Sequence, residues 1–413
     1  MKQSGSCDTL DGAMHRRHFL GAAATGLSVK PAPAGDLAAV RDDFPRARHA
    51  VYLDNASCHP LSVHSAAAVH RYIDWETHEV GEPWWPPWAR PRQDAKNLFA
   101  SLINAKPSEI AFARSTIEAE SNLLNGMNLQ GGNVVTTDLH YSAALNNYRM
   151  RQRAGLDVRV VKHRHWRIDL NDLDRAIDRN TRLVAVALVS NVNGYLHDIK
   201  ATSALAHARG AYVYADIIQC AGAVPIDVRA MGIDLAACST YKWIMGVKGF
   251  GFLYVREDLQ GTVVKPMQHS GGVRFNYPPW VERPDPALEE IACQPVAGPA
   301  RYEVSYPSYE GVIAALESLP YIQRLGVANI RAYVRTLTDR LLKELPALGY
   351  PSITPPGNDS PIVAFEARDP ARTMERLRAA NVHVAMRFGN RLRISPSVYN
   401  NQRDIDRLLE ALA

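Results

Sequence analysis

The sequence predicts an α/β protein with a large domain on a mainly parallel sheet of seven strands, and a smaller C-terminal α+β domain. Short β-branched runs alternate with longer helical patterns from about residue 109 to residue 255, which is typical of a parallel sheet. Beyond about residue 300 the pattern changes to two long helices followed by shorter elements. The chain has 413 residues, of which 46% are hydrophobic and 22% charged, as expected for a globular protein of two or three domains.

Each strand is expected where an apolar, β-branched run ends at a turn signal. In the large domain these runs are residues 109–113, 133–136, 157–161, 183–188, 212–215, 235–238 and 251–255. Longer amphipathic patterns predict helices between them at 117–128, 143–152, 170–177 and 200–209. In the small domain we expect helices at 309–325 and 330–345, a strand at 362–366, a helix near 371–380, a strand ending at 391–394 and a last helix.

The first 35 residues form a part of their own. Arg16 and Arg17 precede a mildly apolar stretch, and the small residues at 31–34 could supply a cleavage site. This part is either a twin-arginine export signal or a disordered tail, so the compartment stays open between cytoplasm and periplasm. We expect a large domain over residues 36–300, with 36–60 contributing to its site, and a small domain over 301–413.

Charge and cysteine content exclude several classes of protein. The 47 Lys and Arg residues barely exceed the 42 Asp and Glu, and they are spread along the chain, so we expect no nucleic-acid partner. The longest apolar run, residues 183–189, is far shorter than the roughly 18 residues that a membrane helix needs. Five cysteines without a C-x-x-C pair predict neither a disulfide framework nor a metal site.

Side chains that could take part in catalysis follow two consecutive predicted strands. The strand at 212–215 delivers Asp216, with Gln219 three residues on, and Lys242 follows the next strand just before a glycine-rich turn. Burying the charge of a lysine just past a buried strand costs free energy unless the lysine is paired or covalently bound. Desolvation also lowers its pKa, so that it can form a Schiff base. The plainer interpretations are a surface lysine at 242, with Lys248 as a rival, and a helix N-cap at Asp216.

Taken in this order, the residues resemble the class V aminotransferases. These pyridoxal-phosphate enzymes include cysteine desulfurases, selenocysteine lyases, kynureninases and isopenicillin N epimerase-like proteins, and the resemblance runs from about Val51 to the C-terminus. It implies the fold type I of pyridoxal-phosphate-dependent transferases, with pyridoxal 5'-phosphate as cofactor. By this resemblance Lys242 forms the internal aldimine and moves the proton at the substrate α-carbon. Asp216 would pair with the protonated pyridine nitrogen, and Gln219 would hydrogen-bond the ring oxygen.

The resemblance also indicates which residues would bind the cofactor phosphate. Ser115 and Thr116 enter a predicted helix, whose N-terminus favours an anion, and Ser239 and Tyr241 would add two further contacts. A plain helix cap would have almost the same sequence as the first pair.

Further residues match family positions that contact the pyridine ring of the cofactor and the substrate. His140 would stack on the pyridine face, and Asn191 would approach the ring oxygen or the substrate. Arg393 would hold the substrate carboxylate with its planar fork, which implies an α-amino acid substrate. The alternatives are a solvent-facing histidine at 140 and an ordinary turn at 191.

Two departures from the family concern the substrate. Residues 385–390 contain no cysteine where a desulfurase carries its persulfide, so we expect no sulfur-carrying desulfurase. Cys58 is either reactive or a small residue packed in a turn. Residues 82–92, with Trp84, Trp85 and Trp88 among four prolines, predict a stiff loop that is neither helix nor central strand, and that either packs at a dimer interface or binds substrate.

The resemblance implies a homodimer in which Ser305 or Tyr306 reaches the partner's phosphate. The function expected first is a lyase that removes the α-proton and expels a β-substituent, carbon–sulfur in type, to give pyruvate and ammonia. An aminotransferase or an epimerase would use the same residues, and a non-catalytic protein of the same fold is a remote third possibility. The glycine turn at 246–251 is not a dinucleotide fingerprint, so a nicotinamide oxidoreductase fits worse.

Overall fold

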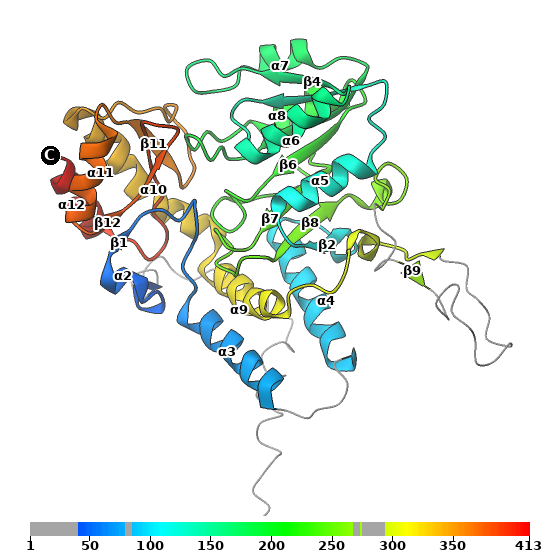
Figure 1. The fold of residues 1–413 in the computed structure, drawn as a ribbon, viewed down its shortest axis with the longest axis horizontal. Helices are drawn as coiled ribbons and strands as arrows, with labels where there is room; N and C mark the ends of the chain where they lie inside the picture. The colour runs from blue at the N-terminus through cyan, green and yellow to red at the C-terminus, as the bar shows by residue number, and fades with distance from the viewer. Residues whose placement is uncertain (1–39, 79–84, 267–272, 275–293) are drawn as a thin grey trace, which may run out of the picture. The chain divides into compact units, whose positions relative to one another are not determined.

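The computed structural model describes residues 40–78, 85–266, 273–274 and 294–413 (Figure 1). The export signal or tail expected over residues 1–35 lies outside these ranges. Within the described ranges, no helix combines the length and the apolar character that crossing a membrane requires.

Residues 110–255 contain a seven-stranded sheet with the order β2-β8-β7-β6-β5-β3-β4 (Figure 1). Only β8 is antiparallel to its neighbours β2 and β7, and all other pairs run parallel. The predicted α/β class with a mainly parallel sheet is therefore confirmed. The strands are β2 (Ile110–Ala113), β3 (Asn133–Thr137), β4 (Asp157–Val161), β5 (Thr181–Ala187), β6 (Tyr212–Asp216), β7 (Leu235–Ser239) and β8 (Gly251–Val255).

Helices cover both faces of this sheet because its strands are apolar on both sides. Phe252 and Tyr254 of β8 pack into one core and Leu253 and Val255 into the other, as the alternation of side chains along a strand requires. The first core includes residues of α4 and α9, and the second includes residues of α5 and α6. The helices between the strands are α5 (Thr116–Gly126), α6 (Ser142–Arg153), α7 (Leu170–Ala176) and α8 (Ile199–His207).

The sheet topology gathers the ends of several strands at one edge. The strands β3, β5, β6 and β7 are parallel, and β2 has their direction because both β2 and β7 are antiparallel to β8. Asp216 ends β6 and Ser239 ends β7, so segments far apart in sequence deliver polar groups to the same place. Open α/β sheets bind their ligands at this edge.

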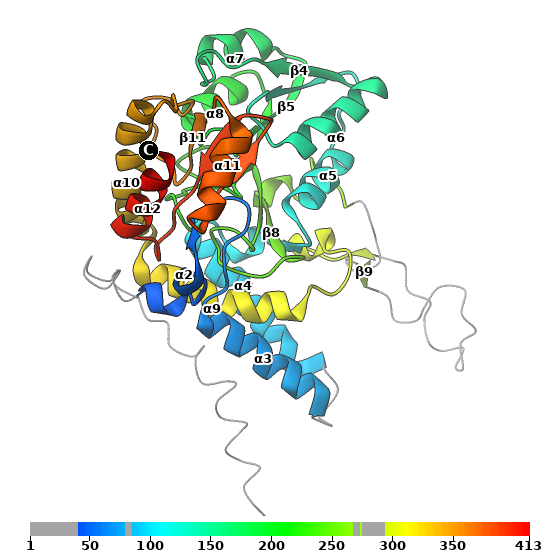
Figure 2. The same ribbon diagram turned by 60° about the vertical axis from the view of Figure 1, so that its left-hand side comes forward.

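The C-terminal part has a second core around an antiparallel sheet of order β11-β14-β13. Helices α10, α11 and α12 pack on this sheet (Figure 2). Strand β1 (Val51–Tyr52) joins the same core by pairing in parallel with β12 (Val382–His383). The remaining elements are β11 (Val363–Glu366), β13 (Ala385–Arg387), β14 (Arg391–Ile394), α10 (Val327–Glu344), α11 (Pro370–Ala379) and α12 (Gln402–Leu412).

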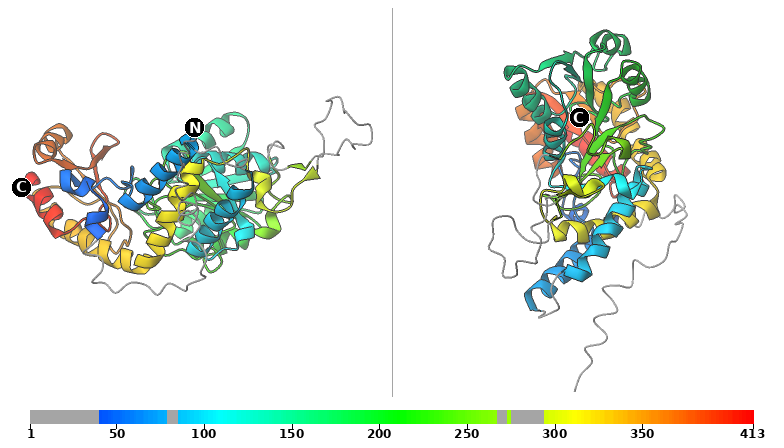
Figure 3. Two further views of the ribbon diagram at one scale, coloured as in Figure 1. Left: turned by 90° about the horizontal axis from the view of Figure 1, so that it is seen from below. Right: turned by 90° about the vertical axis from the view of Figure 1, so that its right-hand side faces the viewer.

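Three helices pack together beside the large sheet (Figure 3). They are α3 (Val63–His78), α4 (Trp85–Leu102) and α9 (Tyr309–Leu325), and α9 contacts both of the others. The expectation that residues 82–92 are not helical is wrong from Trp85 onward. Pro86 and Pro87 occupy the first turn of α4, where a helix needs no backbone N–H, so only Pro91 removes an internal hydrogen bond.

Short elements complete the described chain. They are α2 (Arg46–His49), an antiparallel pair of β9 (Val273–Arg274) with β10 (Gln294–Pro295), and single 3-10 turns at Pro107–Glu109, Glu257–Leu259, Pro299–Tyr302 and Leu345–Leu348.

Candidate active site

A pocket opens at the edge of the large sheet where the strand ends meet. It encloses about 490 Å³ of empty space, part of it open to solvent. Eight of the nine predicted cofactor residues line it together: Ser115, Thr116, Asn191, Asp216, Gln219, Ser239, Tyr241 and Lys242. Ile117, Tyr141, Ala187, Val189 and Ile218 complete the lining. The structure therefore brings into one cavity residues that span more than a quarter of the sequence.

Lys242 is the buried cation of this pocket. The residue is 7% exposed, whereas Lys248 is exposed to solvent on the following turn. The pKa of Lys242 is lowered to about 8, chiefly by burial; Asp216 opposes this shift, and Arg393 adds to it. A lysine with such a pKa is partly neutral near neutral pH, as a nucleophilic amine must be.

Asp216 provides the buried negative charge. It is 2% exposed, and its Oδ1 accepts the backbone N–H of Ile218 at 3.0 Å. Burial raises the pKa of Asp216 to about 6, although the neighbouring His140 favours the carboxylate. At neutral pH the group is therefore mainly ionised, and a cationic partner in the pocket would stabilise it further.

Gln219 lines the pocket but is also tied to the protein. Its Nε2 donates to the carbonyl of Ala56 at 3.0 Å, and its Oε1 accepts from Trp243 Nε1 at 3.0 Å. These bonds fix the amide so that its second N–H is the group left for a ligand.

The first turn of α5 is joined to the end of β7. Thr116 N–H donates to Ser239 Oγ at 2.8 Å, and Ser239 N–H donates to Thr116 Oγ1 at 2.9 Å. Ser115 caps the helix by accepting the Glu118 N–H at 3.1 Å. The Thr116 and Glu118 N–H groups are thus already engaged, and the dipole of the α5 N-terminus favours an anion. Burial raises the pKa of Tyr241 to about 12, so its hydroxyl remains a neutral donor beside them.

His140 lies behind the pocket rather than in its lining. It is 1% exposed, and its Nδ1 accepts the backbone N–H of Tyr141 at 2.7 Å. Its Nε2 is 3.5 Å from Glu120 Oε1, which also accepts from the Tyr148 hydroxyl at 2.6 Å. Tyr141 is the aromatic residue that lines the cavity, with its ring centroid 5.9 Å from Lys242 Nζ. The stacking role predicted for His140 stays a prediction, with Tyr141 as the alternative ring.

Arg393 reaches toward the site from β14. Its guanidinium donates to Asp54 Oδ1 at 3.0 Å, to Ser57 Oγ at 2.6 Å and to the carbonyl of Asn191 at 3.1 Å. Its Nε and the Asn191 Oδ1 are buried without a partner. The sequence analysis expected residues 36–60 to contribute to the site but named neither Asp54 nor Ser57. The pairing of β1 with β12 and a bridge between Asp54 and Ser395 bring these two residues beside β14.

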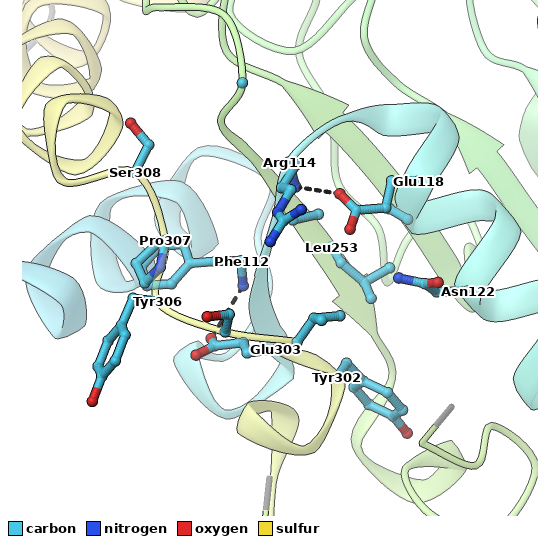
Figure 4. Close-up of a pocket in the computed structure, with 15 residues that line it drawn as sticks. Phe112, Arg114, Glu118, Asn122, Leu253, Tyr302, Glu303, Tyr306, Pro307 and Ser308 are labelled. Atoms are coloured by element: carbon cyan, nitrogen blue, oxygen red, sulfur yellow. Dashed lines mark hydrogen bonds between the residues drawn. The ribbon is translucent and has the colours of Figure 1, made fainter. Parts of the chain in front are cut away.

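A second pocket of about 440 Å³ lies on the outer side of the α5 N-terminus (Figure 4). Arg114 and Glu118 line it from one side, and residues 302–308 line it from the other. Glu303 anchors that segment through ion pairs with Arg92 and Lys96. Ser305 and Tyr306 are exposed here, outside the lining of the Lys242 pocket.

Residues 56–408, most of the chain, match the sequence profile of the family described as aminotransferase class-V. The chain belongs to the class V aminotransferase family. The resemblance inferred from the Asp216 to Lys242 block is thereby confirmed, and so is the prediction of an enzyme.

Known class V proteins share both sequence and fold with this chain. A probable cysteine desulfurase of Methanothermobacter thermautotrophicus is 33% identical, over 73% of this chain and 74% of that protein. The apo structure of a cysteine desulfurase from Thermococcus onnurineus is 25% identical, with a TM-score of 0.77 over 90% of this chain and 96% of that chain.

A variant of the protein C-DES, solved with glycine covalently linked to its pyridoxal-phosphate cofactor, has a TM-score of 0.78 at 18% identity. The match covers 90% of this chain and 98% of the C-DES chain. The predicted fold type I is confirmed, and pyridoxal 5'-phosphate is the cofactor that membership of the class V family indicates.

Proposed function

We propose that this protein is a pyridoxal-phosphate-dependent lyase that acts on an α-amino acid and breaks a carbon–sulfur type of bond at the β-carbon, without a persulfide-carrying cysteine. The observation that carries the proposal is the buried Lys242, with its lowered pKa, in one cavity with the Asp216 carboxylate. Family membership supports the cofactor, and the desulfurase relatives support chemistry at a sulfur-bearing substrate.

The residues of the pocket fit this cofactor. Lys242 would be the amine for its aldehyde, Asp216 would face its ring nitrogen, and the α5 N-terminus with Ser239 would bind its phosphate; all of these residues line the same pocket. The unpartnered Asn191 Oδ1, fully buried, is a polar atom that a ligand would satisfy. When bound, pyridoxal phosphate supplies an electron sink for the pair of electrons left when the substrate loses its α-proton.

Lys242 would accept that α-proton. Proton transfer is most effective when the pKa of the base is close to the working pH, and burial places the pKa of Lys242 at about 8. Asp216, ionised at neutral pH, would hold a proton on the ring nitrogen opposite it.

Arg393 would bind the α-carboxylate of the substrate. Its buried Nε has no partner, whereas its other nitrogens are already held by Asp54, Ser57 and the Asn191 carbonyl. These contacts orient the guanidinium before the substrate arrives, so little side-chain entropy is lost on binding.

The three cysteines within the described ranges support a reaction without a protein persulfide. Cys220 and Cys238 are fully buried, and burial raises the pKa of both thiols well above the usual value, so neither forms a thiolate readily. Cys58 is partly exposed, and its Sγ lies 3.7 Å from the carbonyl oxygen of His59. No cysteine stands in residues 385–390, next to Arg393.

We further propose a homodimer in which Ser305 or Tyr306 donates to the partner's phosphate. Both residues are exposed on the segment anchored by Glu303, on the outer side of the α5 N-terminus (Figure 4). Sedimentation of the holoenzyme at the mass of a dimer is expected, and a monomer that retains tightly bound cofactor would refute it.

The test is the visible spectrum of the purified protein, recorded before and after adding a panel of amino acids. We expect a visible absorption band from the bound cofactor. Pyruvate and ammonia should accumulate with a sulfur-bearing amino acid while the band persists. Bleaching that only a keto acid reverses would indicate an aminotransferase instead. The band should vanish in Lys242→Ala and survive in Lys248→Ala, and a chain that binds no cofactor would overturn the proposal.

A further inference from the structure

Three arginines share one face of the small antiparallel sheet. Arg387 of β13 pairs directly with Arg391 of β14, so their side chains lie on the same face. Arg393 is two residues along β14 and therefore faces the same way. Leu392 and Ile394 point to the other side, into the core of the small domain.

The partners of these arginines differ. Arg393 is paired with Asp54, and Arg391 lies between aromatic rings, 4.8 Å from the Trp166 centroid and 5.1 Å from that of Phe388. Arg387 has a hydroxyl as its partner, and in the described ranges no carboxylate lies within ion-pair distance of it.

Arg387 and Arg393 converge on one atom. Each donates to Ser57 Oγ at 2.6 Å, so their donor nitrogens are separated by at most twice 2.6 Å, or 5.2 Å. The charges of Arg387 and Arg393 also act on Lys242, since each of them contributes to lowering its pKa. Neither arginine is among the residues that line the Lys242 pocket, and Arg387 is exposed to solvent, so the Arg393 clamp has a second, exposed cation beside it.

We propose that the substrate is an α-amino acid whose side chain ends in a second anionic group, which Arg387 binds while Arg393 binds the α-carboxylate. This inference rests on the proposed function. A sulfur-bearing amino acid whose side chain ends in a carboxylate or another oxyanion places its two charges at a spacing that two adjacent guanidinium groups can bridge. A neutral side chain would leave Arg387 without a counter-charge.

The first test uses two unreactive amino acids that lack an α-proton: α-methyl-aspartate, with a second carboxylate, and isovaline, with an uncharged side chain. Spectral titration of the holoenzyme should show α-methyl-aspartate binding about tenfold or more tightly than isovaline, as a charge-assisted contact predicts. Arg387→Ala should reduce this ratio to about one and change isovaline binding less than about twofold. Arg387→Lys should keep part of it.

The matched control is Arg378→Ala, which removes an equal charge from an exposed position of α11 and should leave the ratio unchanged. Equal binding of the two ligands by the wild-type protein, or an unchanged ratio in Arg387→Ala, would overturn the inference.

A second test separates this inference from the cofactor assignment. In the cofactor-free protein, succinate should raise the melting temperature more than butyrate does, and the difference should disappear in Arg387→Ala. Failure to bind pyridoxal phosphate with a retained succinate effect would refute only the proposed function. Cofactor binding without any preference for succinate would refute only the second anionic group.

Discussion

Replacing Asp216 by Asn separates two effects of this carboxylate: the loss of protein stability caused by burying its charge, and its contribution to catalysis when the cofactor is bound. Burial raises the pKa of Asp216 from 3.8 to about 6, and this shift corresponds to at most about 3 kcal/mol of destabilisation of the cofactor-free protein above pH 6. An asparagine can still accept the Ile218 N–H but carries no charge. We therefore expect cofactor-free Asp216→Asn to be more stable than wild type at pH 8, by about 1 to 3 kcal/mol.

The pH dependence gives the prediction its sign. Because the pKa of the folded state lies above that of the unfolded state, stability from protonating Asp216 is complete below the unfolded value and is lost as the pH rises through about 6. The advantage of Asp216→Asn should therefore fall by about half between pH 8 and pH 5. Urea unfolding of both cofactor-free proteins at the two pH values measures this difference.

With cofactor, the effect should reverse. The holoenzyme of Asp216→Asn should lose about 100-fold or more in kcat/KM, because no charge holds the ring nitrogen protonated. Asp178→Asn is the matched control: hydrogen bonds, chiefly from Arg159, lower the pKa of Asp178 to about 2, so this variant should be less stable than wild type at pH 8. Cofactor-free Asp216→Asn that is less stable than wild type at pH 8 would refute the reasoning.

Three further predictions concern the site and its support. Gly194→Ala should lower the free energy of unfolding by about 2 to 4 kcal/mol in urea titrations, since Gly194 has φ +77° and a Cβ would lie 1.9 Å from the Ile362 carbonyl oxygen; wild-type stability would contradict it. Arg393→Lys should raise KM for amino acids about tenfold or more while the cofactor dissociation constant stays within about twofold, because lysine lacks the planar fork; an unchanged KM would exclude Arg393 from the clamp. Cys58→Ser should leave pyruvate production within about twofold of wild type, and loss of activity together with a protein persulfide would show that Cys58 carries sulfur.

The sequence predicted the sheet well because its strands are short apolar runs between turn signals, and such runs have few alternatives. The bounds of β4, β8 and α9 match the prediction residue for residue. The prediction of a non-helical loop is wrong at residues 85–92, because two of the prolines stand in the first turn of a helix, where a backbone N–H is not needed. It also missed β1 and β12, two-residue strands whose pairing is visible only once the chain is folded.

The chemistry of the pocket also divides between sequence and structure. Lys242 and Asp216 were identified from their positions after apolar strands, because local sequence determines where a strand ends and which residue follows it. Their pKa values are set by burial among residues from several strands, which no local pattern records. The placement of Tyr141 in the cavity and of His140 behind it depends on the turn after β3 and on Glu120 of α5.

The sequence by itself thus determined the fold class, the lysine and acid at consecutive strand ends, the glycine turn and the absence of a cysteine near Arg393. Only the tertiary structure decided that Arg387 and Arg393 share Ser57, since β1, β13 and β14 bring together residues more than 300 positions apart. The physical reason is that periodicity and turn residues act over a few neighbours along the chain. Charge compensation and burial act through space, between segments whose contact depends on the complete fold.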